Sequence, residues 1–162
     1  MHLHLVRHAI AAERAGAERD AARPLTAEGK RRFRKCARGL GRIGPRYDAI
    51  VHSPLLRAVE SAELMAGLCD DIRVDDLLAR PPGRPLFTLL SELQQQGAER
   101  LALVGHQPWL GELAAWLTIG STEAASSLPL KKGGVIWLEG NPVPGGMVLR
   151  ASIPPALLRS MR

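Results

Sequence analysis

The hydrophobic positions of this chain fall in short runs separated by longer amphipathic stretches. Short, mostly apolar runs at residues 2–6, 48–52 and 101–104 are typical of buried strands, because strands covered on both faces are largely hydrophobic. A shorter run at residues 72–74 predicts a further strand. These runs are too short for helices of ordinary length, so we interpret them as strands of one sheet.

The amphipathic stretches predict helices, each beginning at a capping or proline signal, over residues 27–42, 54–68, 86–96 and 108–117. Thr26 is the expected N-cap of the first helix, which Gly41 or Gly44 closes. Ser53 followed by Pro54 gives the expected start of the second helix, as an N-cap with proline at the first helical position.

The rest of the chain predicts irregular segments and a hairpin. Residues 9–24, which end in an Arg-Pro pair, and residues 120–132 are expected to be loops. Residues 134–138 and 147–152 predict an antiparallel hairpin around a turn rich in proline and glycine. The alternation of strand and helix predicts a single α/β domain over residues 1–162, a three-layer α/β/α sandwich with a mostly parallel central sheet.

Composition narrows the class of protein. The chain has 162 residues, of which 46% are hydrophobic and 4% aromatic, so aliphatic side chains must form the core. The net charge of +6 favours anionic partners without naming one. The aromatic residues are not interleaved with the basic ones, so we expect no nucleic-acid partner.

Further sequence signals concern compartment and redox state. No apolar run approaches the ~20 residues of a membrane span, and the first residues do not resemble a secretory signal. The two cysteines, Cys36 and Cys69, are expected in helices and lack CxxC spacing, so no disulfide framework is predicted. We expect a cytoplasmic protein that is not bound to a membrane.

Polar residues follow the predicted strands at the points where they end. Arg7 and His8 end the first strand, and His106 follows the strand at residues 101–104. Ser53 follows the second strand, with Arg57 one turn into the next helix. Because ligands bind outside the carboxyl ends of parallel strands, these side chains share one site if the strands are neighbours.

Two arginines and two histidines in one site suit the chemistry of a phosphoryl group. Guanidinium groups bind phosphate oxygens with paired hydrogen bonds. A neutral imidazole is a competent nucleophile near neutral pH, and a second imidazole can donate to the developing charge. The helix expected at Pro54 would add its dipole to the same anion site. The pattern predicts phosphoryl transfer through a phosphohistidine intermediate that water hydrolyses.

Four segments carry a resemblance to a known family: LVRHA at residues 5–9, RPLTAEG at 23–29, SPLLRA at 53–58 and VGHQP at 104–108. Together they resemble the histidine phosphatase superfamily, also called phosphoglycerate mutase-like, over roughly residues 3–117. The short length and the RPLT segment are most similar to the SixA-type phosphohistidine phosphatases. The resemblance implies a phosphoglycerate mutase-like fold and an enzyme that hydrolyses phosphohistidine without a metal or other cofactor.

The resemblance also implies roles for single residues. His8 would be the phosphoryl acceptor, and the phosphate would be bound by the other core residues, Arg7, Arg57, His106 and Ser53. The chain departs mildly from the family pattern. Gln107 stands where asparagine is usual, and Ser61 stands where many relatives have threonine.

The general acid is less clear from the sequence. Larger relatives carry a carboxylic acid on an insert after the second helix, where this chain is short. The candidate carboxyl groups are Asp75, Asp76, Glu13 and Asp20. Phosphohistidine has a weak P–N bond, and its leaving imidazole needs less protonation than an alkoxide. A site without a strong acid therefore favours phosphohistidine over stable phosphomonoesters.

Alternative functions stay open at this point. The chain could be a small-molecule phosphomonoesterase, or a module that binds phosphate or phosphoprotein without turnover. The expected partner is a phosphorylated protein with a phosphohistidine domain, in signal transduction, or a small phosphorylated substrate. A metal site at His2 and His4, which alternate on one strand, lacks a cysteine or carboxylate to complete it.

Overall fold

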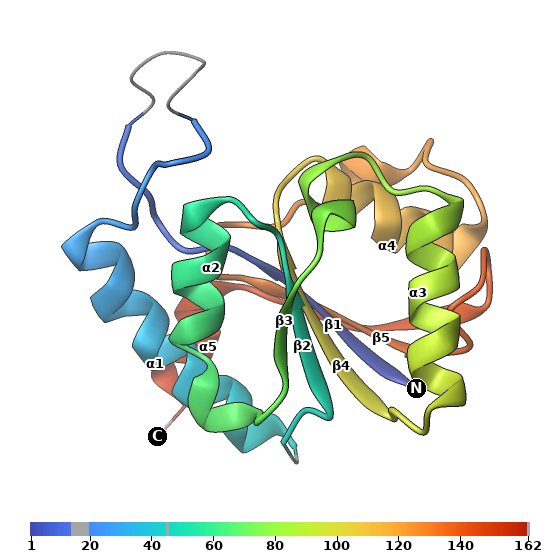
Figure 1. The fold of residues 1–162 in the computed structure, drawn as a ribbon, viewed down its shortest axis with the longest axis horizontal. Helices are drawn as coiled ribbons and strands as arrows, with labels where there is room; N and C mark the ends of the chain where they lie inside the picture. Colours follow the sequence, from blue (N-terminus) through green and yellow to red (C-terminus); the bar gives the residue numbers. More distant parts are fainter. Residues whose placement is uncertain (14–19, 45, 162) are drawn as a thin grey trace.

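A computed structural model describes residues 1–13, 20–44 and 46–161 of the protein. Its centre is a six-stranded sheet in the order β3-β2-β4-β1-β5-β6 (Figure 1). The strands are β1 (His2–Arg7), β2 (Ala49–His52), β3 (Ile72–Val74), β4 (Arg100–Gly105), β5 (Val135–Gly140) and β6 (Met147–Ile153).

Strands β3, β2, β4 and β1 are parallel, and β5 and β6 are antiparallel to their neighbours. The predicted mostly parallel sheet and the predicted hairpin are therefore confirmed. Strand β4 lies directly between β1 and β2. The carboxyl ends of these neighbours consequently meet at one edge of the sheet, as the sequence interpretation required.

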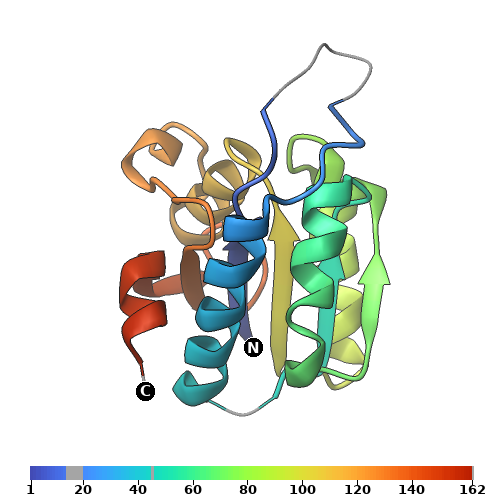
Figure 2. The ribbon, with the colours of Figure 1, turned by 90° about the vertical axis from the view of Figure 1, so that its left-hand side faces the viewer.

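Helices cover both faces of the sheet, which completes the three-layer sandwich (Figure 2). They are α1 (Ala27–Ile43), α2 (Leu56–Glu63), α3 (Arg84–Gln95), α4 (Trp109–Ile119) and α5 (Pro155–Ser160). Helices α1, α2 and α5 pack against one face in one hydrophobic cluster, and α3 and α4 pack against the other in a second cluster. Short 3₁₀ helices lie at Ala66–Leu68, Asp76–Ala79 and Ala125–Ser127.

Strand β1 illustrates how the sequence pattern builds this core. Its Leu3 and Leu5 are fully buried in the cluster under α3 and α4, while Val6 is fully buried in the cluster under α1. Successive side chains of a strand point to opposite faces, so an apolar strand contributes to both layers. This is why a strand with apolar side chains toward both layers forms a central strand here.

Helix α1 forms as its sequence predicts. The Thr26 hydroxyl accepts a hydrogen bond from the Gly29 N–H at 2.9 Å, which satisfies one free donor of the first turn. Phe33 and Leu40 are buried on the face toward the sheet. Gly29 serves a second purpose, because a Cβ built there would lie 2.1 Å from the Ile10 carbonyl oxygen. The first turn therefore packs directly against the segment that follows His8.

The prediction for the start of helix α2 was wrong. The helix begins at Leu56 rather than Pro54, and Ser53 is not its N-cap. Leu55 has an extended backbone with φ −67° and ψ 130°, which excludes it from the helix. The Leu56 N–H donates to the Ala21 carbonyl, so this first donor is already used within the protein. The dipole of this helix therefore begins at Leu56, and not at Pro54 as the sequence predicts.

Helix α2 also ends earlier than predicted, at Glu63, and the stretch up to Leu68 closes with a 3₁₀ turn. Cys69 lies just after that turn and not in a helix. Cys36 lies in α1, and both thiols are free and buried.

Helix α5 was not predicted from the sequence. It begins at Pro155 and packs on α1, where a Cβ at Gly39 would lie 2.1 Å from the Leu158 carbonyl oxygen. The two helix backbones thus approach as closely as a glycine allows. The Pro-Pro pair at residues 154–155 was the signal for this helix start.

The loop predicted over residues 9–24 is only partly described. Residues 9–13 and 20–24 form no helix, and Ala11 makes an isolated antiparallel bridge with Leu25. Residues 14–19 lie outside the described part of the chain. In α4, Pro108 is the N-cap residue rather than the first helical residue.

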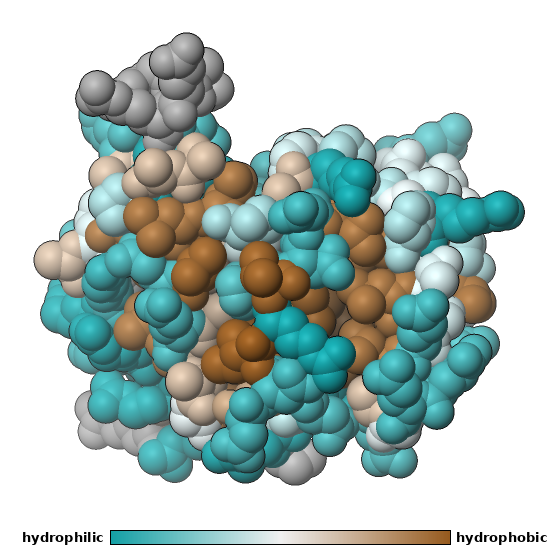
Figure 3. Space-filling view, in the orientation of Figure 1, coloured by the Kyte–Doolittle hydropathy of each residue, from teal (hydrophilic) through white to brown (hydrophobic). Residues whose placement is uncertain are grey.

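One face of the molecule carries hydrophobic surface near its middle, around the edge strand β3 and the neighbouring helix α2 (Figure 3). Val74 of β3 is 59% exposed. The strand has three residues and carries the charged Arg73, features that limit pairing with another edge. Among the helices of the described residues, none has the length and hydropathy needed to cross a bilayer.

Candidate functional site

The carboxyl ends of β1, β2 and β4 bring the predicted site residues together. The rings of His8 and His106 lie with their centroids 5.1 Å apart. The Ser53 hydroxyl lies 2.8 Å from Nε2 of His106. All three side chains are buried, and the Ser53 N–H is fixed on the Val104 carbonyl of β4. The convergence predicted from strand ends is thus present in the fold.

The position of His8 determines which of its ring nitrogens carries a proton. Nδ1 lies 2.7 Å from the Ala9 carbonyl oxygen, which can only accept, so the proton lies on Nδ1. Nε2 then carries the lone pair, and it makes no hydrogen bond with a described residue. The His8 backbone N–H donates to the Gly105 carbonyl, which fixes the residue at the edge of the sheet. The chain thus holds one imidazole with a basic nitrogen free for chemistry.

Ser61 connects the His8 segment to helix α2. Its hydroxyl accepts a hydrogen bond from the Ala9 N–H at 3.0 Å and donates to the Arg57 carbonyl at 2.6 Å. The group that makes both contacts is a hydroxyl, which threonine also carries. The substitution of serine for threonine noted in the sequence therefore leaves these hydrogen bonds intact.

Arg57 lies in the first turn of α2 and is buried. Its guanidinium donates to the Asp20 carbonyl oxygen at 2.8 Å and contacts the Asp20 carboxylate at 3.3 Å. The Nε of Arg23 lies 2.8 Å from the other carboxylate oxygen of Asp20. Asp20 therefore bridges two arginines beside the histidines.

The Arg7 side chain is held by a backbone carbonyl of another segment. One of its terminal nitrogens donates to the Leu130 carbonyl at 2.7 Å, in the loop before β5. Its Nε is buried without a hydrogen bond to any described residue. Burial lowers the pKa of Arg7 from its ordinary value, yet a guanidinium remains charged at neutral pH. Arg7 thus places a fixed positive charge next to His8.

One ring nitrogen of His106 has no hydrogen-bond partner among the described residues. Its Nε2 contacts Ser53, while Nδ1 is buried and has no hydrogen bond to the described residues. Gln107, the amide that departs from the family pattern, accepts a hydrogen bond from the Gly111 N–H at 2.8 Å. This amide therefore stabilises the first turn of α4 rather than pointing its acceptor at the histidines.

Both histidines are neutral at physiological pH. Burial lowers the pKa of His8 to about 3; the hydrogen bond to the Ala9 carbonyl opposes this shift, whereas the neighbouring His106, Arg57 and Arg7 add to it. Burial and the charge of Arg57 likewise lower the pKa of His106 to about 4, although the Asp20 carboxylate opposes this shift. The site is therefore cationic through its arginines, with imidazoles that carry lone pairs.

The candidate acids are distributed unevenly around this site. Asp20 contacts Arg57, whereas Asp75 follows β3 and accepts a hydrogen bond from the Leu77 N–H at 2.8 Å. Asp76 and Glu13 are exposed. Among these carboxylates, Asp20 is the one with a contact to the core residues that the sequence singled out.

The sequence interpretation missed the part played by Arg23. It belongs to the RPLT segment, but no role in the site was assigned to it. Its ion pair with Asp20, and its donation to the Ala12 carbonyl at 3.0 Å, tie the loop after β1 to the Arg57 side of the site. The arginine directly before a proline, in a segment predicted to lie near the site, was the available signal.

The remaining histidines have packing partners. His4 lies 2.7 Å from the Tyr47 hydroxyl, and the Trp137 indole donates to His2 at 3.2 Å. His52 is buried and its Nδ1 lies 3.0 Å from the Ser53 carbonyl. Among the described residues, no three His, Cys, Asp or Glu side chains gather in a cluster that could hold a metal.

The lowered histidine pKa values make stability depend on pH. Burial lowers the pKa of His4 to about 3, as it does for His8, and that of His106 to about 4. Below the histidine pKa of the unfolded chain, about 6.5, the unfolded chain binds protons that the folded chain does not bind. The free energy of unfolding should therefore be highest above pH 6.5 and decrease as the pH falls toward 4.

Urea unfolding at pH 7, 6 and 5 measures this decrease. The slope should approach about 1.4 kcal/mol per pH unit for each such histidine, with no change in the m-value. Replacing His4 with phenylalanine should reduce this slope by up to the contribution of one histidine, about 1.4 kcal/mol per pH unit, even if the substitution also changes the stability at pH 7. A midpoint that stays constant or rises between pH 7 and 5 contradicts the prediction.

Comparisons with known proteins agree with this geometry. Residues 3–79 match the model of the histidine phosphatase superfamily, branch 1. An uncharacterised protein of Picosynechococcus sp. (strain ATCC 27264 / PCC 7002 / PR-6) is 38% identical over 141 residues, which are 85% of this chain and 84% of the relative.

Solved structures show the same fold. The protein histidine phosphatase SixA, complexed with tungstate, superposes with a TM-score of 0.79 at 25% identity, covering 98% of this chain and 99% of that one. Phosphoserine phosphatase from Entamoeba histolytica, in complex with 3-phosphoglyceric acid, gives a TM-score of 0.74 at 18% identity, covering 97% and 98%. At its lower identity, the second likeness concerns the fold alone.

The family match, the sheet order and the SixA-like architecture agree with one another, and they support a phosphatase, a hydrolase acting on phosphoryl groups. This chain belongs to the histidine phosphatase superfamily and is of the SixA type.

Proposed function

We propose that the protein hydrolyses phosphohistidine on a protein substrate, with Nε2 of His8 as the nucleophile. The observation that carries the proposal is the hydrogen bond from Nδ1 of His8 to the Ala9 carbonyl. It fixes the tautomer whose lone pair lies on Nε2, and the lowered pKa of His8 keeps that lone pair free at neutral pH. No base is needed to activate such a nucleophile.

The residues around His8 would bind the phosphoryl group. Arg7 and Arg57 supply guanidinium donors for its oxygens, and the Nδ1 of His106, which has no described partner, is suited to a further hydrogen bond. The Ser53 hydroxyl orients His106 through Nε2. Because these donors are buried and already fixed, they would stabilise the spread charge of the transition state without rearrangement.

The reaction would proceed in two displacements. Nε2 of His8 attacks the phosphorus, the P–N bond to the substrate imidazole breaks, and the electron pair leaves with that imidazole, which takes up a proton. Water then attacks the phosphorus of the phosphohistidine on His8, the P–Nε2 bond breaks, and inorganic phosphate leaves. Both steps are in-line displacements that need charge neutralisation more than covalent assistance.

The leaving-group side supports a phosphoramidate substrate. Asp20 is a candidate acid that contacts the core residue Arg57, but its carboxylate is held by Arg57 and Arg23. A carboxylate engaged by two guanidinium groups is better suited to ordering the loop than to supplying a proton. An imidazole leaving group needs little protonation, whereas an alkoxide depends on a general acid.

Relative activity on the two substrate classes tests this specificity. The value of kcat/KM should be at least about 10²-fold higher for a phosphohistidine peptide than for sugar phosphates or phosphoserine, since general acid catalysis is worth about 10²–10⁴-fold. Release of inorganic phosphate measures both reactions. Comparable turnover of the two classes would favour a small-molecule phosphomonoesterase, and absence of turnover on either would favour a binding module.

A further inference from the structure

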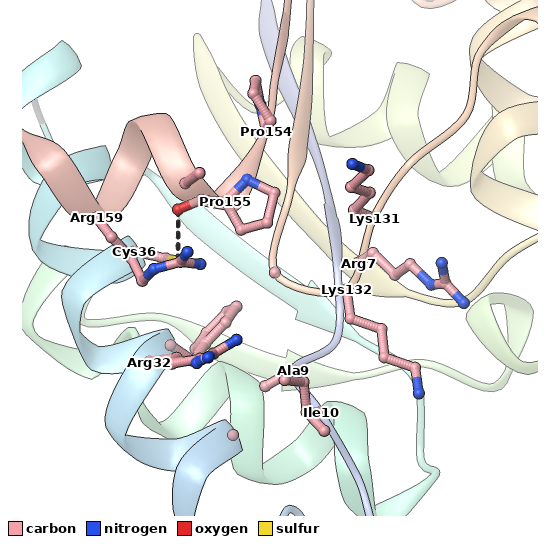
Figure 4. A pocket seen from close by; sticks show the side chains of 14 residues that line it. Arg7, Ala9, Ile10, Arg32, Cys36, Lys131, Lys132, Pro154, Pro155 and Arg159 are labelled. Carbon is pink, nitrogen blue, oxygen red and sulfur yellow. Dashed lines mark hydrogen bonds between the residues drawn. The ribbon is translucent and has the colours of Figure 1, made fainter.

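A second basic pocket lies beside the proposed phosphoryl site, between helices α1 and α5 (Figure 4). Its volume is about 520 Å³, within the range of ligand-binding clefts. The cationic side chains that line it are Arg7, Arg32, Lys131, Lys132 and Arg159, and no carboxylate of the described residues lines it. The mechanism proposed above uses Arg7 alone of this set.

Several of these cations have no carboxylate partner in the described part of the chain. Arg32 forms an exposed ion pair with Glu28 at 2.8 Å. Lys131, Lys132 and Arg159 form no ion pair with any of the described residues. Like charges gathered around a hollow without counter-charges attract an anion, because the low-dielectric walls focus their field.

The walls also carry apolar surface. Phe33 and Cys36 of α1 and Pro155 of α5 line the pocket, and the Cys36 thiol contacts the Pro155 carbonyl at 3.6 Å. In Figure 4, Arg32 and Arg159 lie on the side of these helices, and Arg7 and Lys132 extend on the opposite side. A bare inorganic ion would leave the apolar part unused, whereas an acidic side chain on a polypeptide would contact both kinds of surface.

The pocket is rigidly connected to His8. The Gly133 N–H donates to the carbonyl oxygens of Arg7 and His8 at 3.0 and 3.2 Å, which fixes the loop carrying Lys131 and Lys132 to the end of β1. Ala9 and Arg7 both line the pocket. A group bound there would therefore lie beside the phosphoryl group rather than on a remote surface.

We propose that this pocket binds acidic side chains next to the phosphohistidine of the protein substrate. The proposal rests on the function proposed above and specifies the surface of its substrate. A polypeptide and a small acid would both offer the pocket a second anionic group on the molecule whose phosphoryl group is removed. The size and the apolar lining of the pocket favour a polypeptide over a small acid as the source of that anion.

Matched peptides test the proposal. Two phosphohistidine peptides of equal length would carry glutamate or glutamine at the same positions near the phosphohistidine. Wild-type protein should show a KM about fivefold lower for the glutamate peptide at low salt, and the difference should shrink as salt rises. Lys132→Glu and Arg159→Glu should abolish or reverse this preference.

Arg34→Glu is the matched control. Arg34 is exposed on the same helix as Arg32 and does not line the pocket, and its replacement by glutamate changes the net charge by the same amount as the two test substitutions. It should keep the glutamate preference. Thermal unfolding of each variant would show that the comparison concerns folded protein.

Each outcome bears on a different claim. Equal KM values for both peptides in active wild-type protein would overturn the pocket proposal and leave the proposed function standing. Inactivity of wild-type protein on both peptides and on free phosphoramidate would overturn the proposed function itself. A charge preference found only with small phosphorylated carboxylic acids would overturn the polypeptide assignment.

Discussion

Replacement of His8 with alanine is expected to lower the turnover of a phosphohistidine peptide by about 10³-fold or more. The substitution removes Nε2, and with it the atom that would form the covalent intermediate. Donors on Arg7, Arg57 and His106 remain, so binding of the substrate should persist better than turnover. Initial rates of phosphate release, and a separate binding measurement, would distinguish the two effects.

His2→Ala is the control for this substitution. His2 lies at the amino end of β1, the strand that precedes His8, is partly exposed, and contacts Trp137 rather than the site. Its turnover should match the wild-type value. Radiolabelled substrate should leave an acid-labile phosphoryl group on the wild-type protein but not on His8→Ala. Turnover of His8→Ala at the wild-type rate would refute the nucleophile assignment.

The second large effect is expected at Arg57. Lysine in its place keeps the charge but loses the planar fork, so it can neither contact two phosphoryl oxygens in one plane nor hold Asp20 through both of its contacts. We expect kcat/KM for the phosphohistidine peptide to fall by about 10²-fold, comparable to the loss of one oxyanion donor.

Arg46→Lys provides the matched comparison for this loss. Arg46 is exposed and contacts Asp70 at 2.7 Å, away from the site, so its replacement should leave kcat/KM unchanged. A further variant, Arg57→Ala, should be at least as impaired as Arg57→Lys. If Arg57→Lys stays within twofold of wild type, bidentate binding at this position is disproved.

The strands and the residues at their ends could be predicted because they depend on local sequence. A mostly apolar strand such as β1, which sends Leu3 and Leu5 to one face and Val6 to the other, is stable only when both of its faces are covered, and polar residues directly after it must lie at the sheet edge. The sequence could not show that β4 lies between β1 and β2, because strand order depends on pairing between distant segments. That order is what brings His8 and His106 to a ring separation of 5.1 Å.

The failures have a physical cause in competing demands on single residues. Ser53 has the sequence of an N-cap, but its hydroxyl contacts His106 and the Leu55 N–H, and the chain stays extended until helix α2 begins. Tertiary contacts there override local capping preference. The bridge that Asp20 makes between Arg23 and Arg57 escaped prediction because its contact with Arg57 joins a loop and a helix that are distant in sequence.

Helix α5 was missed for a related reason. Its six residues are too short to show a convincing period, and its stability depends on packing against Gly39 of α1. The pocket between α1 and α5 could therefore not be predicted, because the sequence shows its lysines and arginines but not that they lie together.

The central place of β1 has a consequence for how the protein is made. Its partners are β4 and β5, so the strand that carries the proposed nucleophile pairs with residues 100–105 and 135–139. During synthesis the first strand emerges first but must wait for nearly the whole chain before its neighbours exist. The proposed nucleophile therefore acquires its fixed position late in folding, and chains that end before β5 carry most of the proposed site residues without the complete sheet that positions them.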